Sequence, residues 1–188
     1  MPKHDSIRRL LDARVLLMLD ADHIVEDAAR AAIDAGVGAV EISANANAVD
    51  VATVLRAGLD LAVVAGAVTT AAQAWDAVEA GAHALSAAPL DAEIAAVCEA
   101  ADVAMIAVVS DDAQVAAALA LRPDFLRVPS ELAAVVTTDT PIIVDLPAMP
   151  EHPPGAVLAV SARSLDARSP DELRLRLSTL VGPSTSPP

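Results

Sequence analysis

The sequence predicts an α/β fold, a compact (β/α)8 TIM barrel, and the main evidence is a short segment that recurs along the chain. The copies are residues 33–41, 55–63 and 78–86, with a fainter fourth copy near Ala101. Their glycines, Gly36, Gly58 and Gly81, follow one another at intervals of 22 and 23 residues. A fixed period of this size indicates one supersecondary unit used repeatedly. Because a glycine suited to closing a helix precedes an apolar run in each copy, the unit is helix, tight turn and buried parallel strand.

The number of units favours a closed barrel over an open sheet, since about eight units close a barrel. Apolar, β-branched runs predict eight strands, at residues 15–19, 39–42, 61–65, 84–87, 103–109, 125–128, 142–146 and 157–161. Amphipathic stretches predict the helices that follow most of them, at residues 24–35, 47–57, 70–80, 91–100, 112–121 and 130–136.

The last part of the predicted barrel is abbreviated. The helical stretch after the sixth strand is short, and residues 147–155 contain four prolines, which exclude a helix. We therefore expect a shortened sixth helix and no seventh helix. A final helix at 171–180 follows Ser169 and Pro170, a cap with proline at the first helical position. Residues 1–181 then form a single domain, and residues 182–188, rich in Pro, Ser and Thr, a disordered tail.

The composition restricts the class of partner. Apolar residues make up 55% of the chain, yet no stretch approaches the roughly 18 uninterrupted apolar residues of a membrane helix, and no signal-peptide pattern is present. We therefore expect a cytoplasmic protein with no membrane partner. The net charge of −14 repels phosphodiester backbones, and one Phe, one Trp and no Tyr offer few surfaces for base stacking, so no nucleic-acid partner is expected.

Two charged residues within apolar strands are the candidate catalytic residues, because the chemistry of such barrels lies where the strands end. A carboxylate at Glu41 suits a general acid or base, although it could instead reach solvent or pair with an arginine. A guanidinium at Arg127 must be paired, and Glu41 is the nearest expected counter-charge. Arg127 could clamp a substrate carboxylate or phosphate, or it could form an internal ion pair that plugs the barrel.

Polar and small residues at the other strand ends complete the candidate site. The candidate ligand-binding residues are Asn45, Gly66, Ser86, Ser161, Arg163 and Ser164. Three carboxylates, Asp20, Glu41 and Asp145, could present oxygen ligands to Mg²⁺ or Mn²⁺. The alternative is that carboxylates at these junctions cap the next helix. No other cofactor is expected.

Five segments of the chain resemble the 2-keto-3-deoxy-6-phosphogluconate / 4-hydroxy-2-oxoglutarate aldolase family. They are Val-Leu-Leu-Met-Leu-Asp (15–20), Ala-Val-Glu-Ile-Ser (39–43), Val-Ala-Gly-Ala-Val (64–68), Ala-Val-Glu-Ala-Gly-Ala (77–82) and Phe-Leu-Arg-Val-Pro-Ser (125–130). The family consists of compact trimeric barrels that cleave 2-keto acids through a lysine Schiff base. The resemblance implies a homotrimer, with Glu41 as the acid/base and Arg127 in the place of the Schiff-base lysine.

This last substitution implies a degenerate member of the family, since a guanidinium stays protonated and does not attack carbonyls. The only lysine of the chain, Lys3, precedes the barrel pattern. Other positions differ from the family pattern too, with Asn45 near the expected carboxylate-binding arginine and Ala67 in place of the third-strand threonine. We therefore expect a non-catalytic scaffold or a protein that binds a small anionic metabolite. The alternative is a carbon–carbon lyase (aldolase) or isomerase acting on a small 2-keto acid, with Glu41 as acid/base and with or without a metal ion.

Overall fold

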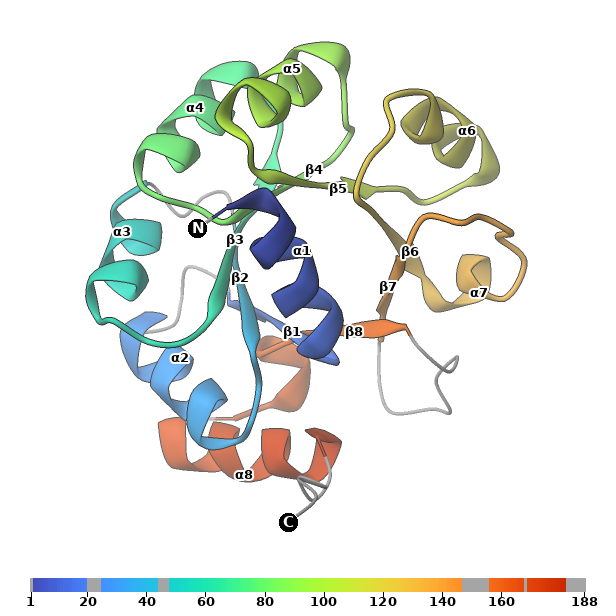
Figure 1. Cartoon of the computed structure of the whole chain (residues 1–188). Coiled ribbons are helices and arrows are strands. Elements are labelled where there is room, and N and C mark those ends of the chain that lie inside the picture. Colours follow the sequence, from blue (N-terminus) through green and yellow to red (C-terminus); the bar gives the residue numbers. More distant parts are fainter. Residues whose placement is uncertain (1, 20–24, 44–47, 147–155, 168, 182–188) are drawn as a thin grey trace.

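The computed structural model describes residues 2–19, 25–43, 48–146, 156–167 and 169–181. Eight parallel strands form a closed barrel in chain order, as Figure 1 shows. The strands are β1 (Val15–Leu19), β2 (Ala39–Ser43), β3 (Ala62–Val68), β4 (Ala84–Ala87), β5 (Ala104–Val108), β6 (Phe125–Pro129), β7 (Ile142–Asp145) and β8 (Val157–Ser161). The predicted TIM barrel is confirmed.

Helices surround the barrel. They are α2 (Val25–Asp34), α3 (Ala48–Arg56), α4 (Ala71–Glu79), α5 (Ala92–Ala101), α6 (Asp112–Ala120), α7 (Ser130–Ala133) and α8 (Pro170–Val181), with a short 3-10 helix, η1, at Arg163–Leu165. The shortened helix after the sixth strand is confirmed, because α7 has only four residues. The prolines that exclude a seventh helix, at 147–155, and the predicted tail, at 182–188, lie outside the described residues. In the part of the chain that the structure describes, no helix is long and apolar enough to cross a membrane.

The glycines of the repeat have the conformation that their role requires. Gly36, Gly58 and Gly81 have φ angles of +83°, +66° and +97°, which side chains rarely adopt. At Gly36 the chain leaves α2, and the amide of Val37 donates back to the carbonyl of Ala32 at 2.9 Å. The repeated glycine therefore ends a helix and directs the chain into the next strand, as the pattern predicts.

One helix was not predicted from the sequence. Residues Lys3–Asp12 form α1, which packs against β3 and β5 and lies across one end of the barrel (Figure 1). Leu10 is fully buried and belongs to the same apolar cluster as Leu16 and Phe125 inside the barrel. Lys3 Nζ lies 3.0 Å from Oδ2 of Asp124, the residue that precedes β6. The helix thus closes the amino-terminal end of the barrel, opposite the end where the strands finish.

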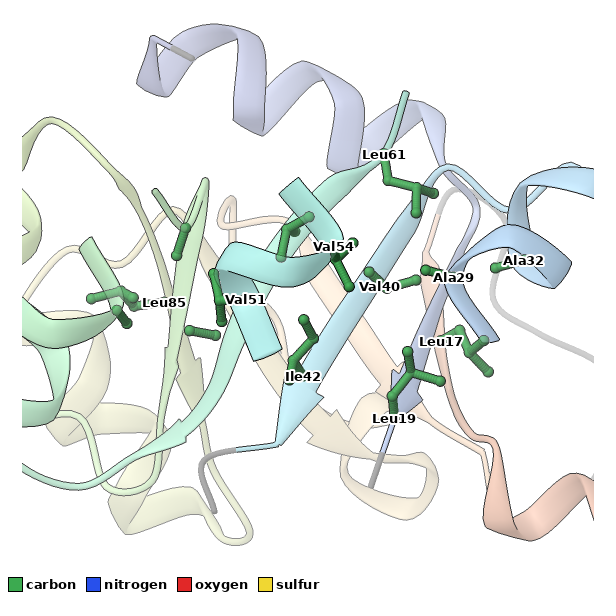
Figure 2. Packing of buried hydrophobic residues seen from close by; sticks show 14 of the residues in the cluster. Leu17, Leu19, Ala29, Ala32, Val40, Ile42, Val51, Val54, Leu61 and Leu85 are labelled. Carbon is green, nitrogen blue, oxygen red and sulfur yellow. The ribbon is translucent and has the colours of Figure 1, made fainter. Parts of the chain in front are cut away.

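The core has two parts, which follow from the alternation of side chains along each strand. One face of the strands packs against the surrounding helices, as Figure 2 shows for Leu17 and Val40 beside Ala29 of α2. The other face fills the barrel interior with the side chains of Leu16, Ala39, Ala62, Val64, Ala84, Ala104, Ile106, Phe125, Ile143, Val157 and Ala159. This parity determines which residues near the strand ends face the barrel interior.

Candidate functional site

Side chains from opposite walls of the barrel meet at the carboxyl ends of the strands. Glu41 lies two residues after the inward-facing Ala39 on β2, and Arg127 two residues after Phe125 on β6. The alternation of strand side chains therefore aims both into the barrel. Asp145 follows the inward-facing Ile143 on β7 by the same spacing.

Arg127 holds this cluster together. Its Nη1 donates to Glu41 Oε1 at 2.8 Å, and its Nε donates to Asp145 Oδ1 at 2.6 Å. Its Nη2 contacts the sulfur of Met18 on β1. One guanidinium thus links strands β1, β2 and β7 to β6, and we call Glu41, Arg127 and Asp145 the mouth cluster. The ion pair across the barrel, one of the two interpretations of Arg127 from the sequence, is present.

The burial of the mouth cluster is uneven. The side chains of Arg127 and Glu41 are 11% and 6% exposed, whereas that of Asp145 is 34% exposed. Burial alone would lower the pKa of Arg127, but Glu41 and Asp145 outweigh this effect and raise that pKa above its ordinary value. Arg127 therefore stays charged, and its nitrogens are committed to neighbouring acceptors.

Two polar atoms near the mouth cluster lack partners among the described residues. Glu41 Oε2 and Ser86 Oγ are both shielded from solvent and form no hydrogen bond there. Ser86 is fully buried, and it follows the inward-facing Ala84 by two residues on β4. Buried polar groups nearly always have a partner, so these two atoms mark the chemically unsatisfied part of the site.

Gly66, a predicted ligand-binding residue, makes room for Glu41. A Cβ on residue 66 would lie 2.4 Å from both Cγ and Oε1 of Glu41, closer than real Cβ contacts occur. Directly after Gly66 the pairing between β3 and β4 shifts, and Ala67 has a φ of +53°. The carboxylate of Glu41 therefore rests against the bare backbone of β3.

The predicted ligand-binding residues on β8 and η1 make local hydrogen bonds. Ser161 Oγ accepts from the amide of Arg163 at 3.2 Å, and Ser164 Oγ donates to the carbonyl of Ser161 at 2.7 Å. These hydroxyls stabilise the turn between β8 and η1. The structure does not bring them into hydrogen-bond contact with the mouth cluster. Asn45 lies outside the described residues.

The predicted metal ligands are divided between described and undescribed residues. Glu41 and Asp145 face each other across Arg127, and Asp20 lies outside the described residues. The described part of the chain contains no group of three or more histidine, cysteine or acidic side chains arranged to hold a metal ion. The space between the two described carboxylates contains a cationic side chain.

Two contacts of the mouth cluster were not predicted from the sequence. Met18 is an apolar residue in an apolar strand, although its position two residues after the inward-facing Leu16 indicates the barrel interior. Asp145 was expected as a metal ligand and not as a partner of Arg127. The parallel register of β6 and β7 pairs Arg127 with Ile143, which places Asp145 next along the same inward face.

The model of the KDPG and KHG aldolase family matches residues 6–139, most of the chain, including Glu41, Gly66, Ser86 and Arg127. The chain belongs to the KDPG and KHG aldolase family. A search of curated protein sequences finds no match.

Solved structures of KDPG aldolases share the fold of this family member. The 4-hydroxy-2-oxoglutarate/2-dehydro-3-deoxyphosphogluconate aldolase from TTHB1 is 22% identical, with a TM-score of 0.76 over 93% of this chain and 96% of that one. The enzyme of Zymomonas mobilis ZM4, solved with 3-phosphoglycerate, is 20% identical, with a TM-score of 0.73 over 94% and 91% of the two chains. The Legionella pneumophila enzyme, solved with pyruvate captured as a covalent carbinolamine, is 13% identical, with a TM-score of 0.73 over 93% and 97%.

Proposed function

We propose that this chain is a non-catalytic member of the aldolase family, a scaffold or small-ligand-binding barrel that forms no Schiff base. The observation that carries the proposal is the position of Arg127 inside the barrel, where the family resemblance implies the reactive lysine. A guanidinium whose pKa is raised by two carboxylates has no free amine electron pair with which to attack a carbonyl.

The position of the only lysine supports the same proposal. Lys3 is on α1, at the end of the barrel opposite the mouth cluster, and pairs there with Asp124. The Legionella relative was solved with pyruvate held as a carbinolamine, a species that requires an amine nucleophile. In this chain no lysine side chain is placed to form one.

Among non-catalytic roles, the contacts of Arg127 disfavour the capture of an anion. A carboxylate or phosphate at Arg127 would have to displace Glu41 or Asp145, which already accept its Nη1 and Nε protons at 2.8 Å and 2.6 Å. The displaced carboxylate would then repel the incoming anion. We therefore propose that the mouth cluster is a structural ion pair and that a bound ligand would be neutral at this point.

The test is reductive trapping. Wild-type protein is incubated with pyruvate and sodium borohydride and then weighed by mass spectrometry, and no adduct is expected. The matched variant Arg127→Lys restores an amine beside Glu41, and an adduct on this variant would locate the lost nucleophile. An adduct on the wild-type protein would overturn the proposal.

The alternative function, a carbon–carbon lyase or isomerase acting on a small 2-keto acid, is favoured by one observation. Glu41 is buried and keeps one carboxylate oxygen unpartnered among the described residues, as an acid/base group requires. Pyruvate release from 2-keto-3-deoxy acids, measured with and without Mg²⁺ or Mn²⁺, separates the two functions. Turnover by the wild-type protein that is lost in Glu41→Gln would establish the alternative.

We further propose that residues 1–181 form one domain and that the chain assembles as a homotrimer. A designed protein cage built by fusing symmetric oligomeric domains has a 19% identical chain, with a TM-score of 0.75 over 89% of this chain and 70% of that one. Native mass spectrometry tests the assembly, and a monomer at micromolar concentration would contradict it.

A further inference from the structure

The two unpartnered polar atoms near the mouth cluster lie on neighbouring parts of the barrel wall. The carboxylate of Glu41 rests against Gly66, since a Cβ at residue 66 would clash with it. In the pairing of β3 with β4, Ala65 pairs with Leu85 and Val68 with Ala87, so Ser86 is opposite the Gly66–Ala67 bulge. Strands in a sheet are about 4.8 Å apart. Glu41 and Ser86 therefore approach the same stretch of bare backbone from its two sides.

The chemistry of the two atoms is complementary to a single hydroxyl group. Glu41 Oε1 already accepts from Arg127, so Oε2 remains as an acceptor without a donor among the described residues. The Ser86 hydroxyl both donates and accepts, and it is not bonded to Glu41 or to another described group. A guest O–H can donate to Glu41 Oε2 and accept from Ser86 Oγ, which satisfies both atoms together.

The charge around this point favours a neutral guest. Glu41 and Arg127 are both almost fully buried and balance each other, whereas the extra negative charge is on Asp145, which is one-third exposed to solvent. An anionic guest would meet the unpaired oxygen of Glu41. A cationic guest would add an unbalanced charge to a buried pair that is already neutral.

We propose that Glu41 Oε2 and Ser86 Oγ form a binding site for one neutral hydroxyl group, supplied by a water molecule or by a small alcohol. The two sources share the same donor and acceptor pattern, and the shielding of both atoms requires a small guest. The site gives the non-catalytic barrel a ligand class and rests on that proposed function only in that the guest is bound and not converted.

The experiment is a high-resolution crystal structure of the wild-type protein, alone and after soaking in ethylene glycol. We expect density within hydrogen-bond distance of both Glu41 Oε2 and Ser86 Oγ. A single atom that persists after soaking identifies water, and density extended by two carbons identifies the alcohol. An empty space, or a direct hydrogen bond between the two side chains, would overturn the proposal.

Matched variants at residue 86 provide the control. Ser86→Ala removes the hydroxyl and is expected to reduce the occupancy of the guest or to weaken ethylene glycol binding about 10-fold, the effect of one hydrogen bond. Ser86→Val fills the space and is expected to exclude the guest. An occupancy unchanged in both variants would contradict the role of Ser86. Borohydride trapping of the wild-type protein would refute the non-catalytic function and leave these crystallographic results unaffected, so the two failures are distinguishable.

Discussion

The carboxylate of Glu41 occupies the space that a side chain on Gly66 would need, since a Cβ there would lie 2.4 Å from Glu41 Cγ and Oε1. Residue 66 on β3 thus controls the position of a residue on the neighbouring strand β2. The ion pair between Glu41 and Arg127 depends on this missing side chain, because any displacement of the carboxylate changes its 2.8 Å contact with Nη1.

The first prediction is that Gly66→Ala is destabilising. We expect a loss of about 2–3 kcal/mol, typical of an overpacked core, measured by urea denaturation. In a Glu41→Ala background the same change should cost much less, since the clashing atoms are gone. Equal costs in the two backgrounds would show that Gly66 is needed for its backbone conformation alone.

The second prediction concerns the ion pair itself. Arg127→Met leaves Glu41 buried without its cation and should lower the free energy of unfolding by about 3–5 kcal/mol. Adding Glu41→Gln removes the stranded charge, and the double variant should recover at least half of that loss. A double-mutant cycle in urea measures the coupling, and additive losses would contradict the pairing.

The third prediction is a dependence of stability on acid that is due to His83. The Nδ1 of His83 accepts a hydrogen bond from the amide of Val63 at 3.0 Å, and burial lowers the pKa of His83 to about 4. Between this value and the unfolded value of about 6.5, the unfolded chain binds more protons, so stability falls as the pH drops through this range. With allowance for partial exposure, we expect His83 to account for a loss of about 2 kcal/mol.

The control for this prediction is His83→Asn, whose amide oxygen can accept from Val63 without titrating. Urea denaturation of both proteins at pH 7 and pH 4 isolates the contribution of His83, since the other histidines are common to both. An identical loss of stability in the two proteins would assign the acid sensitivity to other groups.

The fourth prediction is that Cys98 is unreactive in the folded protein. Cys98 is fully buried on α5, and burial raises the pKa of its thiol to about 11. The reactive thiolate is therefore scarce at neutral pH. A thiol reagent such as DTNB should react with one equivalent only after denaturation in guanidinium chloride, and fast labelling of the folded protein would contradict the burial.

Much of the barrel was predictable because the strands carry a local signal. The runs at 15–19, 84–87 and 157–161 coincide with β1, β4 and β8, since strands covered on both faces are uninterrupted apolar segments. Helix α1 was not predictable in this way. Its sequence offers only a narrow apolar face, and its burial of Leu10 depends on a barrel end that does not exist until the sheet closes.

The site was predictable in part for a similar reason. The pairing of Arg127 with Glu41 follows from the rule that a buried cation needs a counter-charge. The contact with Asp145 depends on the register between β6 and β7, and the unpartnered Oε2 depends on the side-chain conformation that Gly66 allows. Neither register nor side-chain conformation has a pattern in the sequence, so these features required the structure.

The closure of the sheet has a consequence for the behaviour of the chain in concentrated solution. Every strand from β1 to β8 is hydrogen-bonded to two neighbours, including β1 to β8, so the described strands leave no open sheet edge. An open edge of unpaired amides and carbonyls is the template on which β-aggregates grow. In a chain that is 55% apolar, ring closure removes that template and protects the folded protein against fibre formation.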